Sequence, residues 1–235
     1  MKNIIGAVLG VTTAFVLAGN ASAASSVYTD EASFKAASGA DPLSLNEFGD
    51  ITTPGQISAR TYTTGSPIPA SYRVATGGFG AGDPFDIFSI LNSDGTKCVG
   101  VSVMPYGDQS LQIDMLSGGA AAVGGNFFNT DQNGDFSPNA WLAFTLSDGT
   151  VTNFLAGSTN SFFGFVSGGP SSYITQVKVF NKDLSIGGLY PTASRLYVVG
   201  AVQVPEPSVV ITNLAVLLSA GMGAVYYRRR NAVRN

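Results

Sequence analysis

The sequence contains no histidine and only one cysteine, Cys98. Without histidine the chain has no Ser-His-Asp or Cys-His catalytic group, no imidazole ligand for zinc and no histidine acid–base chemistry. One cysteine excludes a disulfide within the chain, and a free cysteine is usually a small buried side chain, so we expect Cys98 to be buried on a strand. Carboxylates could still act as acid and base, but nothing in the sequence selects a pair, and no catalytic residue is assigned.

Charged residues are also few, at 11% of the chain, and the two signs are separated along it. The stretch 24–204 is about seven charges negative, whereas Arg228, Arg229, Arg230 and Arg234 gather at the C-terminal end. An acidic domain repels the phosphates of nucleic acids, so we exclude nucleic acid as a partner. Cations or neutral polymers suit such a domain better.

The first 23 residues have the organisation of a secretory signal peptide. Lys2 precedes an apolar stretch over residues 4–17, and Ala21-Ser22-Ala23 provides the small residues that signal peptidase reads. The sequence therefore predicts export and cleavage after Ala23. An uncleaved membrane anchor is the alternative, but the apolar stretch is short for a membrane span.

The last 32 residues, 204–235, combine three features in a fixed order. Pro205, Glu206 and Pro207 predict an extended, accessible segment, because the prolines fit neither a helix interior nor a strand ladder. Residues 208–227 follow without a charge and are long enough to cross a hydrocarbon layer of about 30 Å as a helix. The cluster Arg228, Arg229 and Arg230 would stay on the cytoplasmic side and leave the rest of the chain outside.

Taken together, Pro205-Glu206-Pro207, the apolar stretch and the arginine cluster resemble the PEP-CTERM sorting signal of exported Gram-negative bacterial proteins. The resemblance implies recognition by exosortase, an integral-membrane transpeptidase-like enzyme, and removal of the tail near residues 205–207. It also implies a transient anchor in the inner membrane and a final place in the cell envelope, on the outer surface or in a biofilm matrix rich in extracellular polysaccharide. A plain C-terminal membrane anchor is the alternative.

The central stretch, residues 24–203, reads as a β-rich domain. A short helix is expected over residues 29–37, with Thr29 as its cap, and residues 41–86 read as irregular loops with short strands. Period-2 alternation then marks Val99, Val101 and Val103 on one strand and Leu111, Ile113 and Met115 on the next. Further strands are expected at residues 140–146, 151–155, 161–166, 173–180 and 195–202, with an Asp148-Gly149 hairpin turn.

Seven or more short strands without alternating helices predict an all-β fold, an antiparallel β-sandwich of jelly-roll type, with a barrel as the alternative. This domain is flanked by the signal peptide and the C-terminal transmembrane sorting helix. The stretches 122–131, 146–150 and 162–166 are also similar to the β-sandwich domain common among PEP-CTERM exported proteins. That resemblance implies the same fold over about residues 97–202 and implies no function.

Two groups of residues are candidates for ligand binding. Asp131, Asn133 and Asp135 place oxygen atoms at alternate positions beside Gly134, which suits calcium, although the spacing matches an EF-hand only in part and such turns also form without metal. A core position is expected for Phe127, Phe128, Phe162, Phe163 and Phe165. Aromatic contacts to carbohydrate are instead expected from Tyr62, Tyr72, Tyr106 and Trp141, the last of which could equally be packed on its strand.

The sequence therefore favours a non-enzymatic, exported β-sandwich that is a structural or adhesive component of the envelope or biofilm matrix. A carbohydrate-binding module is the alternative. A secreted hydrolase that uses two carboxylates is the third and least favoured hypothesis.

Overall fold

The computed structural model describes residues 24–40, 44–65, 69–77, 87–91, 95–101, 109–169, 172–182 and 188–201. The predicted signal peptide, the predicted sorting segment and Tyr106 lie outside these residues. Within the described ranges, no helix combines the length and the apolar character that a membrane crossing needs.

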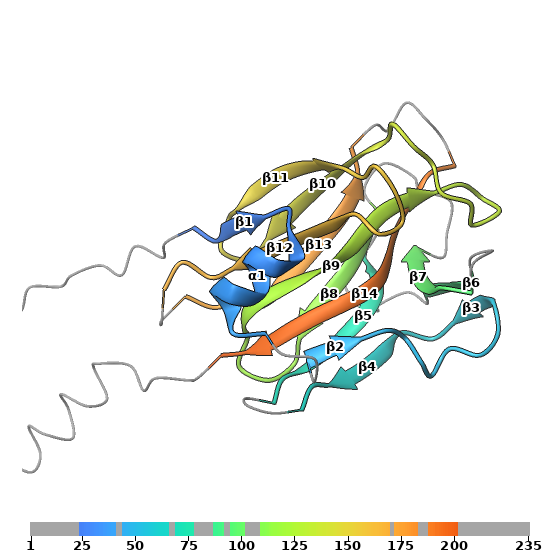
Figure 1. Ribbon diagram of the computed structural model, residues 1–235. Helices are drawn as coiled ribbons and strands as arrows, with labels where there is room; N and C mark the ends of the chain where they lie inside the picture. The colour runs from blue at the N-terminus through green and yellow to red at the C-terminus, as the bar shows by residue number, and fades with distance from the viewer. Residues whose placement is uncertain are drawn as a thin grey trace, which may run out of the picture.

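The described chain forms two antiparallel sheets and one helix (Figure 1). The first sheet has the order β1-β12-β9-β14-β7-β6-β3, and β2 also pairs with β14. Its strands are β1 (Ser26–Tyr28), β12 (Phe162–Val166), β9 (Ala120–Thr130), β14 (Tyr190–Gly200), β7 (Lys97–Val101), β6 (Ile87–Leu91), β3 (Gly55–Ile57) and β2 (Leu45–Asn46).

The second sheet has the order β11-β10-β13-β8-β5-β4. Its strands are β11 (Val151–Leu155), β10 (Trp141–Leu146), β13 (Gln176–Asn181), β8 (Ser110–Met115), β5 (Ser71–Gly77) and β4 (Arg60–Thr63). From β8 onward the chain passes repeatedly from one sheet to the other, so most neighbours in a sheet are distant in sequence.

One hydrophobic core lies between the two sheets. It contains Phe127 and Phe163 from the first sheet and Phe144 from the second, with the Phe144 ring centroid 5.2 Å from that of Phe127 and 4.8 Å from that of Phe163. Alternate residues of β8 and β10 face this core, because successive side chains of a strand point to opposite faces. Two antiparallel sheets around a shared core agree with the predicted all-β sandwich.

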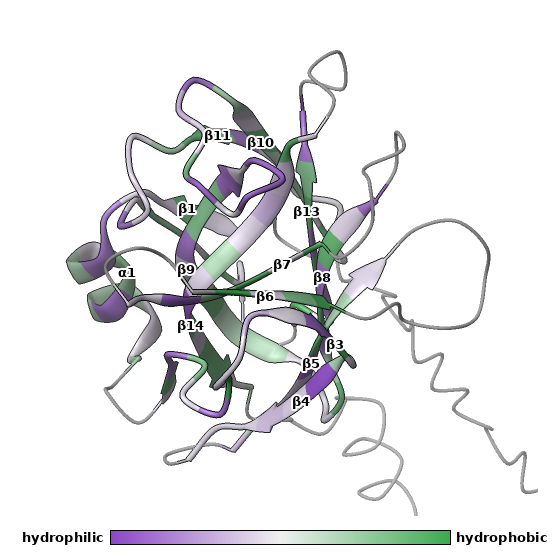
Figure 2. Cartoon of the chain, turned by 90° about the vertical axis from the view of Figure 1, so that its right-hand side faces the viewer, coloured by the Kyte–Doolittle hydropathy of each residue, from purple (hydrophilic) through white to green (hydrophobic). Residues whose placement is uncertain are grey.

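The helix α1 (Glu31–Ser38) covers the outer face of the first sheet. In Figure 2 it lies beside β9 and β14, on the side away from β8 and β13. Phe34 of the helix is fully buried against Phe162 and Tyr197. Gly124 and Gly164 accommodate this ring, because a Cβ at Gly124 would stand 3.0 Å from a Phe34 ring carbon and one at Gly164 would stand 2.7 Å from another.

The predicted helix is present, but its cap is one residue later than expected. Asp30, which has an extended backbone, accepts a hydrogen bond from the Ser33 N–H at 2.8 Å, so the cap is Asp30 and the expectation for Thr29 is wrong. The carboxylate three residues ahead of Ser33 has the reach that an N-cap needs. Gly39 ends the helix with φ +66°, a left-handed conformation that suits glycine.

Most strand predictions from residue 97 onward are confirmed, including the hairpin, in which the Gly149 N–H donates to the Leu146 carbonyl at 3.1 Å. Cys98 and the five predicted core phenylalanines are buried, whereas Val103 lies outside the described residues. The described part of residues 41–86 contains the expected short strands, β2 to β5, and β5 contributes to the core. One expectation is corrected, because β9 and β14 are 11 residues long and not short.

Candidate functional site

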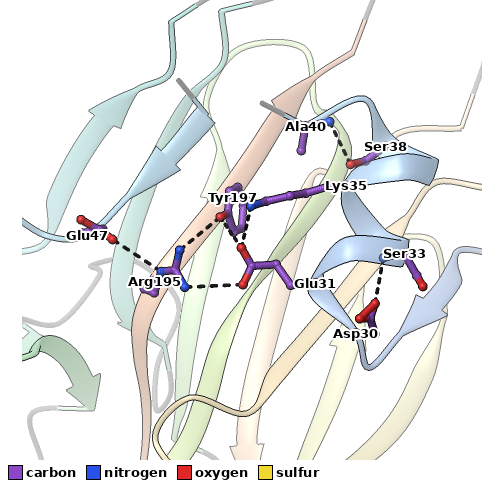
Figure 3. Close-up of polar contacts among 9 residues, drawn as sticks. All are labelled: Asp30, Glu31, Ser33, Lys35, Ser38, Ala40, Glu47, Arg195 and Tyr197. Carbon is purple, nitrogen blue, oxygen red and sulfur yellow. Dashed lines mark hydrogen bonds and ion pairs between the residues drawn. The ribbon is translucent and has the colours of Figure 1, made fainter. Parts of the chain in front are cut away.

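The clearest polar arrangement on the outer face of the first sheet joins α1 to β14. Glu31 accepts hydrogen bonds from the Tyr197 hydroxyl at 2.6 Å and from Lys35 Nζ at 2.7 Å (Figure 3). Arg195 donates from Nη1 to the second oxygen of Glu31 at 3.4 Å and from Nη2 to the Tyr197 hydroxyl at 3.3 Å. The network holds the Arg195 guanidinium at a fixed place beside the helix.

The network also sets the ionisation of its members. Burial alone would raise the pKa of Glu31, but the hydrogen bonds from Lys35 and Tyr197 and the charge of Arg195 outweigh it, so this pKa lies below its usual value. The hydrogen bond to Glu31 is the main cause that raises the pKa of Lys35. Glu31 therefore stays ionised, and Lys35 protonated, over the whole neutral range.

A β-bulge at Ser194 breaks the regular pairing of β14. Along β9 the register shifts between Ala193, opposite Phe127, and Arg195, opposite Asn126, which leaves Ser194 as the extra residue. On its other edge β14 pairs with β7 as far as Ala193 and with β2 from Leu196 onward. Ser194 and Arg195 thus stand at the gap between two partner strands.

A cleft of about 390 Å³ opens at this gap, and we call it the bulge cleft. Four segments surround it: the bulge itself, the residues after β2, the turn before β7 and the loop between β11 and β12. Its lining consists of Ser194, Arg195, Glu47, Gly49, Gly95, Thr96, Lys97 and Asn160. Apart from two glycines, every residue of the lining has a polar or charged side chain, which suits a solvated ligand with many hydrogen-bonding groups.

Two polar atoms of the bulge have no hydrogen-bond partner. Ser194 is 2% exposed, and both its Oγ and the Nε of Arg195 are buried and make no hydrogen bond. Glu47 approaches the Arg195 Nε to 3.5 Å, an ion-pair distance, but its side chain is 66% exposed and makes no hydrogen bond to that nitrogen. Lys97, which also lines the cleft, donates from Nζ to the Gly49 carbonyl at 2.9 Å.

A second cleft, of about 200 Å³, lies on the other side of the β2 segment and shares Glu47 with the first. Tyr62 and Tyr72 line it, together with Asn46. Tyr62 is half-buried, and its ring packs 5.6 Å from that of Tyr72. We call this opening the Tyr62 cleft.

The structure corrects one aromatic candidate and separates the others. Tyr72 is 1% exposed on β5, and its hydroxyl accepts a hydrogen bond from Asn46 Nδ2 at 2.9 Å, so its ring offers no exposed face for a sugar. Sequence reasoning failed here because it placed Tyr72 in a loop. Trp141 is 45% exposed on β10, in the second sheet, with Lys182 Nζ 5.5 Å from its ring centroid. The structure therefore does not bring Trp141 together with Tyr62.

The loop of residues 131–135, which we call the Asp131 loop, uses its acidic side chain internally. One carboxylate oxygen of Asp131 accepts from the N–H groups of Asn133 at 2.8 Å and Asp135 at 3.0 Å, and the other accepts from Asn133 Nδ2 at 3.3 Å. This is the hydrogen-bonding pattern of an Asx turn. In the part of the chain that the structure describes, no group of three or more cysteine and acidic residues converges as a metal site would require.

Sequence reasoning missed the bulge cleft, since none of its residues belongs to a recognisable motif. The one local signal is the loss of alternation at residues 193–196, where Ala193 and Leu196 both belong to the core between the sheets. Comparison of the chain with known protein families, with curated proteins and with solved structures finds no match.

Proposed function

We propose that this protein is an exported, non-enzymatic β-sandwich that binds extracellular polysaccharide at the cell surface or in the surrounding matrix, as a structural or adhesive component. The observation that supports the proposal most directly is the bulge cleft, an open cleft of about 390 Å³ whose lining carries several hydrogen-bonding side chains and lies beside a buried hydroxyl without a hydrogen-bond partner. Sugars offer many hydroxyl groups, and a site for them needs several donors and acceptors held in place.

The second cleft supports a polymer in preference to a single sugar. Glu47 lines both openings, so the bulge cleft and the Tyr62 cleft are neighbours along the β2 segment. An extended chain could contact both. The half-buried Tyr62 side chain, which joins an apolar ring to a polar hydroxyl, would be the aromatic contact at the second opening.

A retention experiment on immobilised polysaccharides tests this function. We expect the exported protein to be retained by at least one polymer of a panel of neutral and acidic glycans. The change Asn160→Trp, which fills the bulge cleft from an exposed loop position, should abolish retention. Asn133→Trp, the same change at an exposed position of the Asp131 loop, serves as the control. Retention on no polymer, or equal retention of both variants, would contradict the proposal.

The hydrolase hypothesis ranks below binding. A glycosidase of the common type needs two carboxyl groups on either side of the scissile bond. Among the residues that the structure describes, one carboxylate lines the bulge cleft, that of Glu47. We therefore keep the non-enzymatic proposal.

We also propose that the jelly-roll form of the sandwich, the signal peptide and the PEP-CTERM tail belong to this function. The repeated passage of the chain between the sheets from β8 to β14 supports the jelly roll. The tail would deliver the domain to the envelope, where exosortase removes residues after the Pro205-Glu206-Pro207 segment. In a host with exosortase, the mass of the exported protein should lack the arginine cluster 228–230, and a mass that retains it would overturn the sorting proposal.

A further inference from the structure

We propose that the bulge cleft is specific for acidic sugars, and that a uronic-acid carboxylate binds between Ser194 Oγ and Arg195 Nε in place of Glu47. This inference rests on the proposed polysaccharide binding and names its ligand class. It depends on the two unpaired atoms at the bulge, on the weak contact of Glu47 and on the local excess of positive charge.

The first argument is the pairing of unsatisfied groups. Among the described residues, four buried side-chain N or O atoms have no hydrogen-bond partner, and two of them, Ser194 Oγ and Arg195 Nε, are on adjacent residues beside the same cleft. Buried polar groups are nearly always paired, so adjacent exceptions need an explanation. Both atoms can donate a hydrogen bond, and a carboxylate, with two acceptor oxygens, can accept both.

The second argument is the position of Glu47. Its carboxylate stands 3.5 Å from the Arg195 Nε, yet it makes no hydrogen bond there and its side chain is largely exposed. The Glu47 carboxylate therefore occupies a position next to Arg195 that suits an anion, but it contacts the guanidinium only weakly. Because an exposed ion pair of this kind contributes little free energy, a ligand carboxylate with better geometry can displace it.

The third argument is the local charge. Lys97 and Arg195 are the cations of the lining and Glu47 is its acid, so the displacement of Glu47 leaves a positive cleft in a domain that is negative as a whole. Arg195 is also held by Glu31, which is balanced by Lys35. At physiological ionic strength, charges more than about 8 Å away are largely screened, so the nearby cations decide which ligand binds.

The remaining lining favours a sugar over a free inorganic anion. Ser194 Oγ and Arg195 Nε lie at the bulge, which is one part of the cleft. Asn160 and the turn at Gly95 and Thr96 line the rest of it. A small anion bound at the bulge would not reach these residues. A uronic-acid residue would place its carboxylate at the bulge and its hydroxyl groups along the polar lining.

Titration of the exported protein with an oligogalacturonate, with a neutral galactan oligosaccharide of equal length and with inorganic phosphate tests the inference. We expect the acidic oligomer to bind roughly tenfold or more tightly than the neutral one, because a buried charge-assisted hydrogen bond contributes on the order of one tenfold step in affinity or more. Equal or tighter binding of the neutral oligomer would overturn the acidic specificity and leave the proposed function standing. Binding of neither oligomer would overturn the inference, and retention on the polymer panel would then decide the proposed function separately. Phosphate that binds as tightly as the acidic oligomer would point to a simple anion site and overturn the sugar assignment.

Three variants locate the binding at the bulge. Ser194→Ala should weaken binding of the acidic oligomer roughly tenfold and leave the melting temperature unchanged or raised, since it removes a buried hydroxyl that has no partner. Glu47→Gln should strengthen binding, whereas Asp135→Asn, which removes the same charge at the Asp131 loop, should not. A loss of folding cannot produce this gain at Glu47. Equal effects of Glu47→Gln and Asp135→Asn, or no effect of Ser194→Ala, would overturn the inference.

Discussion

The Asp131 loop and the bulge at Ser194 both carry polar side chains, but they differ in how these groups are used. In the loop, Asp131 accepts hydrogen bonds from the backbone of its own turn. In the bulge, Ser194 Oγ and Arg195 Nε are buried without a hydrogen-bond partner, beside a cleft. A polar side chain whose hydrogen bonds are all made within its own turn serves to hold that turn. Buried polar groups without a hydrogen-bond partner are better candidates for ligand binding.

The difference has a physical origin in the two connections. The Asp131 loop joins residues a few positions apart, so one side chain can reach the whole turn. The bulge is held by strands far away in sequence, and no neighbour along the chain is placed to reach Ser194. A buried donor or acceptor left unpaired costs free energy, about 1–3 kcal/mol, which the surrounding sheet must offset.

The change Gly125→Ala should break the bulge and have the largest effect. A Cβ at Gly125 would stand 2.0 Å from the Arg195 carbonyl oxygen, so the bulged strand could not keep its place. We expect the free energy of unfolding to fall by about 3 kcal/mol, at the upper end for overpacking, as measured by chemical denaturation. Gly157→Ala is the control, because the Cβ there would meet only Ser161 Oγ at 3.9 Å. Equal stability of the two variants would show that the bulge is not built as described.

The change Asp131→Ala should destabilise the Asp131 loop by a smaller amount. It removes the acceptor for the N–H groups of Asn133 and Asp135, and we expect the free energy of unfolding to fall by about 1–2 kcal/mol, because these bonds involve a charged acceptor at an exposed site. Asn133→Ala, which removes one contact of 3.3 Å, should cost clearly less in the same denaturation experiment. If both variants are as stable as the parent, the turn does not depend on its carboxylate.

The pH dependence of stability should reveal the network that holds Arg195. The pKa of Glu31 is lowered in the folded state, so its ionised form contributes stability above its unfolded value of about 4.5, and this contribution disappears as the pH falls through the folded pKa. Glu31→Gln should therefore be less stable than the parent at pH 7, by about 1 kcal/mol or less for a partly exposed pair.

The difference between Glu31→Gln and the parent should shrink as the pH falls below about 4.5 and vanish once the pH lies below the folded pKa of Glu31, where the side chain is protonated in both the folded and the unfolded parent. Denaturation curves recorded from pH 3 to pH 7 measure it. Glu47→Gln is the control, because its carboxylate is exposed and lies 3.5 Å from Arg195 without a hydrogen bond. A difference for Glu31→Gln that persists unchanged at pH 3 would contradict the proposed role of its charge.

The sequence predicts those parts of the fold that depend on residues close together along the chain. The Asp148-Gly149 turn between two alternating strands predicts the hairpin, and the alternation of Leu111 and Ile113 predicts a core strand. The strand β9 was harder to predict because Gly124 and Gly125 interrupt its apolar pattern. Glycine is needed at these positions because a Cβ at Gly124 would meet Phe34 and one at Gly125 would meet Arg195, two residues far away in sequence.

The bulge cleft could not be predicted for the same reason, because its lining comes from four distant segments. The net charge of the domain also pointed away from it. About seven excess negative charges favour neutral or cationic partners, but this sum averages over the whole surface and conceals Lys97 and Arg195 in one cleft. For Tyr72 the error was to predict a ligand contact where there is none. The sequence places this tyrosine in a loop, whereas in the structure it is a buried core residue of β5.

Calcium should have the smallest effect, and it tests the Asp131 loop directly. A calcium ion takes six to eight oxygen ligands, as a rule, and Asp131 could join them only if its oxygens left the N–H groups that they now accept from. We therefore expect the same melting temperature with calcium and with a chelator. If the loop were a site, calcium at one hundred times the dissociation constant would add roughly 2.7 kcal/mol to the free energy of unfolding. The melting temperature would then rise by several degrees, which calorimetry would detect. If such a shift appears and Asp135→Asn removes it, the loop is a metal site. The view that the Asp131 loop is satisfied by its own hydrogen bonds, in contrast to the bulge, would then be wrong.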